Sequence, residues 1–234
     1  MLKRVINNLI NFFSTKKLYV FGDSHARVFN YINKNLNTNH FFEVLAIGGA
    51  TAQGLANPRS KTNALLLFKE MIHLECNKKD ELFFFLGEVD CGFVIWYRAK
   101  KHNETVEFQF DRSLKNYKEF LLSVKNDGYK NINIIETVLP TIFDGFEGQI
   151  AHERNEVNAS IKERTDLTKR YNRKLEEIAN ENNFGFVRIT KSIMHKKSGL
   201  IKISLLNDDK SNHHLSNIKF APLIYKNILN VLDK

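Results

Sequence analysis

The stretch Val20-Phe21-Gly22-Asp23-Ser24-His25-Ala26 places a polar turn directly after an apolar run. The run from Leu18 to Phe21 is dominated by β-branched and aromatic residues and is too short for a helix, so it predicts a buried strand. Gly22 permits a tight backbone turn where the strand ends. Ser24 would then lie at the N-terminus of a helix, where unpaired backbone N–H groups favour developing negative charge. That position suits the nucleophile of acyl transfer, although serine and aspartate are also ordinary helix N-cap residues.

Similar apolar runs alternate with helical patterns along the whole chain. They cover residues 18–21, 41–46, 82–86, 132–135 and 184–189. Such alternation predicts right-handed βαβ crossovers and a parallel sheet with helices on both faces. Ligands of such sheets bind beyond the carboxyl ends of the strands, and Ser24, Gly49 and Asp90 all follow strand ends. No linker rich in proline or glycine divides the 234 residues, so residues 18–234 are expected to form a single domain.

Four short blocks follow these runs in a fixed order. They are Gly22-Asp23-Ser24-His25, Ile47-Gly48-Gly49-Ala50-Thr51, Leu86-Gly87-Glu88-Val89-Asp90 and, near the C-terminus, Asp208-Asp209-Lys210-Ser211-Asn212-His213-His214-Leu215-Ser216. Their order resembles the SGNH/GDSL family of esterases and acyl hydrolases along nearly the whole chain. The resemblance implies a three-layer α/β/α fold with a flavodoxin-like, parallel, five-stranded sheet. It also implies that Ser24 is the catalytic nucleophile and that the backbone N–H groups of Ser24 and Gly49 form the oxyanion hole.

The third block departs from the Gly-x-Asn-Asp pattern of that family, because Val89 falls on the asparagine. Removing one oxyanion donor costs roughly 3 to 4 kcal/mol of transition-state stabilisation in serine hydrolases. Valine cannot donate a hydrogen bond, and an ionised Glu88 can only accept one. The sequence therefore predicts either a slow catalyst or a donor from the following segment, where the candidates are Arg98, His102 and Asn103. The block Gly-Glu-Val-Asp-Cys also resembles a bacterial subgroup of the family. Substrate contacts are expected from Asp23, Gly87, Glu88 and Asp90.

The fourth block resembles the Asp-x-x-His-Leu-Ser pattern of the family. Its trailing Leu-Ser predicts that His214 is the general base, with Asp209 as the acid that orients it. Such an acid fixes the tautomer that leaves one ring nitrogen free to accept the serine proton. The residue three positions before His214 is Ser211, so His213 as the base and Asp208 as the acid stay open. A solvated His-His loop or an adventitious metal site is the non-catalytic interpretation.

Together these residues predict a serine esterase or acyl hydrolase that acts through an acyl-enzyme on an O-acylated carbohydrate or a similar small ester. A carbohydrate O-acyltransferase and a non-catalytic SGNH-like binding protein are the alternatives. No cofactor and no metal are expected. The formal net charge is +9, but the lysines and arginines are scattered and no nucleic-acid-binding module is recognisable, so nucleic acid is not an expected partner.

Several segments bear on the setting of this site. Residues 93–110 have no clean period and predict a lid or a substrate-binding insertion, and residues 141–156 are expected to wall the opposite side of the pocket. Cys76 and Cys91 form no Cys-x-x-Cys pair, which favours a reducing cytoplasm over a disulfide framework. Residues 1–17 have apolar positions at helical spacing and predict an amphipathic helix rather than a signal peptide. This helix is expected to pack on the domain or a partner subunit, with peripheral membrane contact as the alternative.

Overall fold

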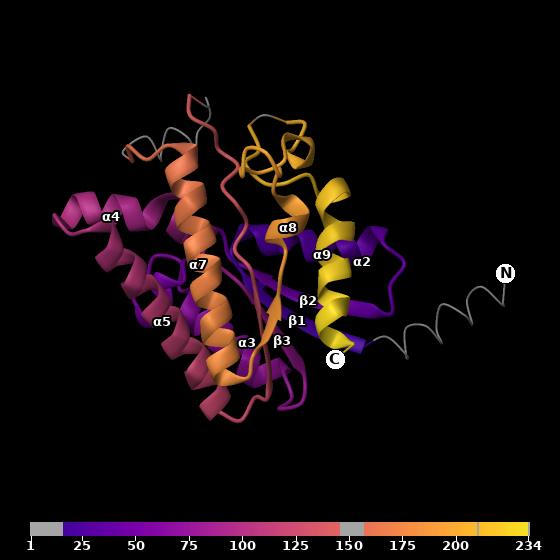
Figure 1. Cartoon of the computed structure of the whole chain (residues 1–234). Helices are drawn as coiled ribbons and strands as arrows, with labels where there is room; N and C mark the ends of the chain where they lie inside the picture. The colour runs from indigo at the N-terminus through magenta and orange to yellow at the C-terminus, as the bar shows by residue number, and fades with distance from the viewer. Residues whose placement is uncertain (1–15, 146–156, 210, 234) are drawn as a thin grey trace.

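A five-stranded parallel sheet lies at the centre of the structure, a computed structural model that describes residues 16–145, 157–209 and 211–233 (Figure 1). Its strands are β1 (Lys16–Gly22), β2 (His40–Ala46), β3 (Glu81–Phe85), β4 (Asn131–Ile135) and β5 (Gly185–Val187). They lie in the order β2-β1-β3-β4-β5, and every neighbouring pair is parallel. This is the flavodoxin-like strand order, so the predicted fold class is confirmed.

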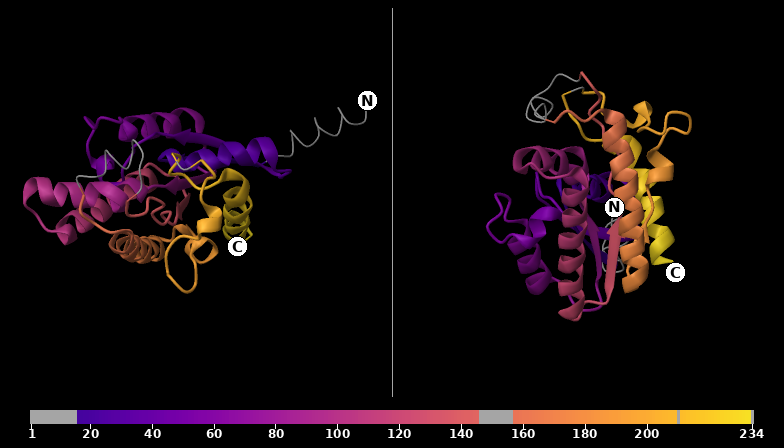
Figure 2. Two further views of the ribbon diagram at one scale, coloured as in Figure 1. Left: turned by 90° about the horizontal axis from the view of Figure 1, so that it is seen from above. Right: turned by 60° about the vertical axis from the view of Figure 1, so that its left-hand side comes forward.

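Helices connect the strands and cover both faces of the sheet (Figures 1 and 2). They are η1 (Ser24–Arg27), α2 (Val28–Asn35), η2 (Gln53–Ala56), α3 (Ala64–Glu75), η3 (Asp90–Val94), α4 (Ile95–His102), α5 (Val106–Asn126), α7 (Ile161–Asn182), α8 (Thr190–Ile193), η4 (Ile203–Leu205) and α9 (Asn217–Leu232). The apolar sides of α3, α5 and α7 pack on one face, and those of α2, α8 and α9 pack on the other. The protein therefore has the three layers that the alternation of patterns predicted.

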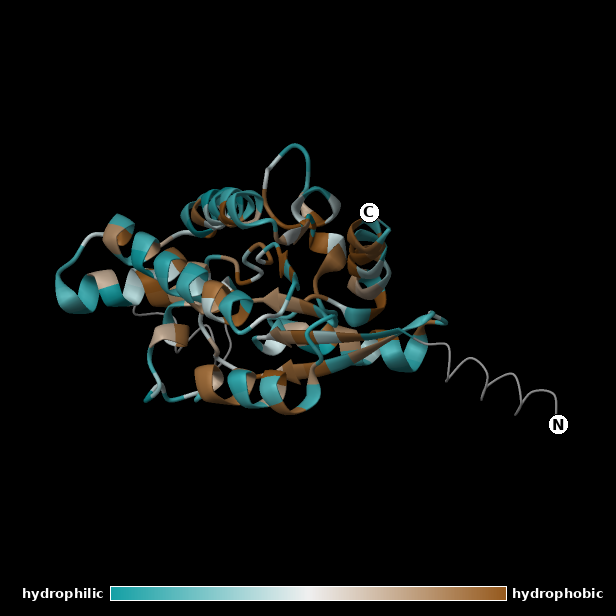
Figure 3. Cartoon of the chain, turned by 90° about the horizontal axis from the view of Figure 1, so that it is seen from below, coloured by the Kyte–Doolittle hydropathy of each residue, from teal (hydrophilic) through white to brown (hydrophobic). Residues whose placement is uncertain are grey.

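The first strand shows why the sheet is buried on both sides. Tyr19 and Phe21 pack with α3, α5 and α7, whereas Leu18 and Val20 pack with α2 and α9. Successive side chains of a strand point to opposite faces, so a strand covered on both faces must be apolar throughout. Figure 3 shows the result, with hydrophobic residues concentrated in the strands and hydrophilic residues along the outer sides of the helices.

Two close backbone approaches bring the polar turns to one edge of the sheet. The Asp23 N–H donates to the Phe85 carbonyl oxygen at 3.2 Å, and the Ile47 N–H donates to the Gly22 carbonyl oxygen at 2.9 Å. A Cβ atom at Gly22 would lie only 2.4 Å from the Phe85 carbonyl oxygen, so this position requires glycine. The turns that follow β1, β2 and β3 are therefore held side by side at the carboxyl edge of the sheet.

Three segments differ from their predictions or lie partly outside the described residues. Residues 93–110 contain the end of η3, all of α4 and the start of α5. The sequence showed no clean helical period here because the wider π turn of η3 shifts the spacing of apolar residues. β1 begins at Lys16, so residues 16 and 17 belong to the strand and not to the predicted N-terminal helix. The rest of that helix, residues 1–15, lies outside the described part, as do residues 146–156 of the predicted pocket wall. Among the described residues, no helix has the length and apolar character needed to cross a bilayer.

Candidate active site

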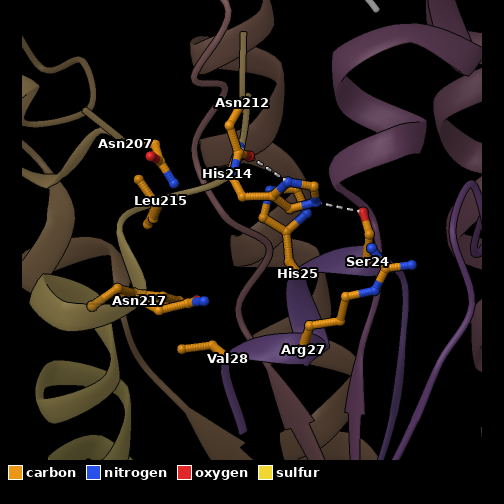
Figure 4. Close-up of a pocket in the computed structure, with 10 residues that line it drawn as sticks. Ser24, His25, Arg27, Val28, Asn207, Asn212, His214, Leu215 and Asn217 are labelled. Carbon is orange, nitrogen blue, oxygen red and sulfur yellow. Dashed lines mark hydrogen bonds between the residues drawn. The ribbon is translucent and has the colours of Figure 1, made fainter. Parts of the chain in front are cut away.

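Ser24 and His214 meet although 190 positions separate them in the chain (Figure 4). The Nε2 atom of His214 lies 2.8 Å from the Ser24 hydroxyl oxygen, and its Nδ1 atom lies 2.9 Å from the Asn212 Oδ1 atom. An amide oxygen can only accept a hydrogen bond, so Nδ1 carries the proton and Nε2 offers its lone pair to the serine hydroxyl. The three side chains thus have the connectivity of a nucleophile, a base and an orienting group.

The orienting residue differs from the prediction. Asp209 was expected to hold His214, but its carboxylate accepts hydrogen bonds from the Ser211 backbone N–H at 2.9 Å and from the Ser211 hydroxyl at 2.7 Å. Asp208 forms an ion pair with Lys219 at 3.1 Å. Asn212 lies at the place expected for the acid. It stands two residues before His214, and its Oδ1 also accepts a hydrogen bond from the His214 backbone N–H at 3.0 Å in a tight Asx turn. The sequence contained one sign of this difference, because Ser211 stands three residues before His214, where the family pattern has an acid.

Two further imidazole rings surround the base. The ring centroids of His213 and His214 are 4.0 Å apart, and those of His25 and His214 are 4.7 Å apart. The His213 backbone carbonyl accepts a hydrogen bond from the Thr141 hydroxyl, which ties the loop after β4 to the histidine loop. Since Nε2 of His214 contacts the Ser24 hydroxyl directly, the geometry favours His214 over His213 as the base.

The surroundings of His214 favour its neutral form. Burial lowers the pKa of His214 to about 3, with the adjacent rings of His25 and His213 and the charge of Arg27 acting in the same direction and the carboxylate of Glu88 opposing them. Asn212 is uncharged and so does not stabilise an imidazolium as a carboxylate would. His214 is therefore ready to accept a proton at neutral pH, but it is a weaker base than the histidine of a Ser-His-Asp triad.

We predict that Asn212→Asp raises the pKa of His214. An added carboxylate at Nδ1 favours the imidazolium, so the acid limb of the pH profile of kcat/KM should move upward by about 1 to 3 pH units. The wild-type profile should stay flat from neutral pH down to about pH 5, because a base with a lowered pKa is deprotonated throughout that range. Ester hydrolysis between pH 4 and 9 measures both.

The matched control is Asn217→Asp, which adds the same charge to the same pocket without a hydrogen bond to His214. It should move the acid limb less than Asn212→Asp does. A wild-type acid limb near pH 6.5, or equal movement in the two variants, would contradict this account of His214.

Asp23 and His25 form a buried pair on either side of Ser24. The Asp23 carboxylate accepts from the His25 backbone N–H at 2.8 Å and lies 3.1 Å from the His25 Nδ1 atom. Asp23 is thus the N-cap of η1 and fixes the turn that presents Ser24. It was expected to contact substrate, and the structure corrects this, because its side chain lies inside the protein and holds the nucleophile turn.

The third block is also more internal than predicted. Asp90 is 0 % exposed, and its carboxylate accepts from the backbone N–H groups of Ala52 at 2.7 Å and Gln53 at 2.9 Å and from the Ser113 hydroxyl at 2.8 Å. These bonds join the third block to the loop that carries Gly49. Substrate contact by Asp90 is therefore wrong as a prediction, because its carboxylate is enclosed and already accepts three hydrogen bonds.

Gly87 and Glu88 are buried beside Asp90. Gly87 has a φ of +113°, and a Cβ there would lie 2.4 Å from the Thr137 hydroxyl oxygen. Both the backbone conformation and the close packing therefore require glycine at this position. Glu88 is 3 % exposed, and its negative charge acts to raise the pKa of His214. Neither residue lines the pocket around Ser24, and substrate contact by Gly87 and Glu88 stays a prediction.

The predicted oxyanion donors lie on neighbouring strand ends. Ser24 is the first residue of η1, and Gly49 has a φ of +73° in the exposed turn after β2. Within the described residues, the backbone N–H groups of Ser24 and Gly49 have no hydrogen-bond acceptor. Val89 offers no donor, and the three substitutes that the sequence suggested, Arg98, His102 and Asn103, lie on or just after α4 and do not line the pocket around Ser24.

The pocket around Ser24 has a volume of about 150 Å³ (Figure 4). An engineered protein cavity of about this size holds benzene, so the space suits a short acyl group or a single ring. Its lining residues are Ser24, His25, Arg27, Val28, Asn207, Asn212, His214, Leu215, Asn217 and Phe220. Across the described part of the chain, no cluster of three or more His, Cys, Asp or Glu side chains has the arrangement of a metal site.

Comparisons with known proteins give the class of fold to which this arrangement belongs. No family model matches the sequence, and no curated protein sequence matches it. Solved structures do match. A putative platelet activating factor from Streptococcus pneumonia shares 18 % identity at a TM-score of 0.62, over 94 % of this chain and 84 % of that one. A GDSL-like lipase from Bacteroides thetaiotaomicron shares 16 % identity at a TM-score of 0.59, over 93 % of this chain and 86 % of that one.

A third similar structure is a catalytic mutant of an acetylxylan esterase from Geobacillus stearothermophilus. It shares 14 % identity at a TM-score of 0.58, over 94 % of this chain and 95 % of that one. These likenesses cover nearly the whole of each chain. The protein therefore has the fold of GDSL-type lipases and esterases, which confirms at the level of the fold the resemblance that the four sequence blocks indicated.

Proposed function

We propose that this protein is a serine esterase that hydrolyses a small O-acyl ester through an acyl-enzyme. The observation that carries the proposal is the 2.8 Å contact between His214 Nε2 and the Ser24 hydroxyl oxygen, with Asn212 fixing the tautomer at Nδ1. A hydroxyl at a helix N-terminus beside a neutral, oriented imidazole is the arrangement that nucleophilic acyl transfer needs. The fold of esterases and lipases around it supports the same conclusion.

In the proposed mechanism the Ser24 oxygen attacks the ester carbonyl while its proton passes to His214 Nε2. The tetrahedral oxyanion accepts hydrogen bonds from the backbone N–H groups of Ser24 and Gly49. The C–O bond to the alcohol then breaks, and the imidazolium returns the proton to the leaving oxygen. Water, deprotonated by His214, then attacks the acyl-serine. The bond between the acyl carbon and the Ser24 oxygen breaks, the imidazolium returns its proton to that oxygen, and the carboxylic acid is released. Val89 supplies no donor, so we expect slower turnover than in enzymes with an asparagine at this position.

An O-acylated carbohydrate is the proposed substrate class. The amide side chains of Asn207, Asn212 and Asn217 line the pocket, and amides both donate to and accept from sugar hydroxyl groups. The pocket volume suits one sugar ring or a short acyl chain. The structurally similar acetylxylan esterase acts on an acetylated polysaccharide by its name, which favours an acetyl ester as the first substrate to test.

A fluorophosphonate probe tests the proposal directly, because it phosphonylates only an activated serine. We expect the wild-type protein to gain one covalent adduct, with the label on Ser24 located by peptide mass spectrometry. Ser24→Ala should remove the label, and Ser192→Ala, at a serine in α8 away from the pocket, should keep it. Absence of label on folded wild-type protein would contradict the esterase and favour a non-catalytic binding protein, the alternative that Val89 and the uncharged Asn212 support.

A further inference from the structure

Arg27 shares one face of η1 with the proposed nucleophile. η1 is a 3₁₀ helix from Ser24 to Arg27, and side chains three positions apart eclipse each other in such a helix. Both side chains line the same pocket, and Figure 4 shows the Arg27 side chain extending along the pocket beside Ser24.

The Arg27 guanidinium also reaches the loop of the second block. Its terminal nitrogen lies 3.8 Å from the point where a Cβ on Gly48 would stand. Gly48 directly precedes Gly49, the proposed oxyanion residue, so the positive charge lies between the nucleophile turn and the oxyanion loop. The charge of Arg27 also lowers the pKa of His214.

No carboxylate balances this charge among the described residues. Three other arginines have acidic partners, in the pairs of Arg164 with Asp144, Arg170 with Glu107 and Arg188 with Glu176. The Arg27 side chain has no ion-pair or hydrogen-bond partner within the described ranges, and the residues that line its pocket include no Asp or Glu. A guanidinium presents five N–H donors in a planar fork that matches a carboxylate or a phosphate.

We propose that Arg27 binds an anionic group, a carboxylate or a phosphate, carried by the substrate close to its scissile ester. This inference rests on the proposed esterase function and narrows its substrate class to acidic esters, such as an O-acetylated sugar acid or sugar phosphate. An anion at Arg27 also neutralises the charge that disfavours the imidazolium of His214, so substrate binding strengthens the base that acts on it.

The test compares matched esters. Acetate release is measured from an O-acetylated neutral methyl hexoside and from the same sugar with a carboxylate or a phosphate on its primary carbon. A succinate half-ester carries the charge in its acyl group instead, and the corresponding butyrate ester is its neutral partner. We expect the wild-type kcat/KM to be at least about tenfold higher for one or more of the charged esters than for its neutral partner.

Three variants assign that preference to Arg27. Arg27→Gln should reduce the ratio of charged to neutral kcat/KM to about one, and Arg27→Lys should keep part of it, because an ammonium retains the charge but not the planar fork. The matched control Arg173→Gln removes an exposed arginine from α7, outside this pocket, and should leave the wild-type ratio and activity unchanged.

Two kinetic results would overturn the inference. One is an active wild-type enzyme that prefers none of the charged esters. The other is an Arg27→Gln variant that loses the same factor on charged and neutral esters, which would make Arg27 an oxyanion donor. Failure of the esterase proposal is recognised separately, as absence of the Ser24 label. In that case calorimetric titration with the non-acetylated sugar acid and sugar phosphate decides, because binding that Arg27→Gln abolishes supports the anion site and absence of binding overturns it.

Discussion

Replacing His214 by alanine is expected to lower kcat/KM for an acetyl ester by about 10⁴-fold while the protein stays folded. The imidazole is the group within 2.8 Å of the Ser24 hydroxyl that can accept its proton, and Asn212 can only orient it. Without the base, serine must attack as a neutral alcohol. Steady-state hydrolysis with an aryl acetate measures the loss, and circular dichroism confirms the fold.

The double variant tests whether the two residues act as a unit. Ser24→Ala and His214→Ala together should cost no more than the larger single loss, because either change alone removes the nucleophilic route. His73→Ala is the matched control, since His73 lies exposed on α3, where its Nε2 atom is 3.7 Å from the Asp127 carboxylate. A His214→Ala variant with more than about a tenth of wild-type activity would contradict the mechanism.

Replacing Asp90 by alanine is expected to lower the free energy of unfolding by about 3 to 5 kcal/mol. Alanine would leave two buried backbone N–H groups, of Ala52 and Gln53, and the Ser113 hydroxyl without their acceptor. Each unsatisfied buried donor costs about 1 to 3 kcal/mol. A domain of this kind has only about 5 to 15 kcal/mol of stability, so the variant should unfold at much lower urea concentration.

The matched control is Asp111→Ala, which removes an exposed carboxylate from α5 and should change the unfolding free energy by less than about 0.5 kcal/mol. Asp90→Asn keeps the shape of the side chain, so its loss of unfolding free energy should lie between those of Asp90→Ala and Asp111→Ala. Equal urea midpoints for Asp90→Ala and the wild type would show that Asp90 does not anchor the loop of the second block.

The strands were predictable because their signal is local. Each apolar run follows from burial on both faces of a parallel sheet, and a run such as residues 132–135 needs no knowledge of its neighbours to be recognised. The helical period of residues 93–110 was missed for an equally local reason, since the π turn of η3 adds a residue to one turn and shifts the pattern.

The candidate site was predictable in its types of residue more than in its contacts. Ser24 and His214 were found from the short blocks that contain them, and the structure brings them together. Asp209 and Asn212 are both polar, stand close to His214 in sequence and could each accept from Nδ1. The choice between them depends on the path of one loop, in which Asp209 turns back to Ser211 and Asn212 turns toward the ring.

The sequence by itself determined the order of strands and helices and the glycine turn after β1, because hydrophobic spacing and turn chemistry act over a few residues. Ser24 and His214 became the candidate nucleophile and base through the resemblance of the short blocks that contain them. Only the tertiary structure decided that Asn212 contacts the imidazole of His214, that Asp23 and Asp90 are buried supports, and that Arg27 lines the pocket. The reason is that burial and hydrogen-bond partners depend on segments far apart in the chain, whose meeting is fixed by the packing of the sheet and helices.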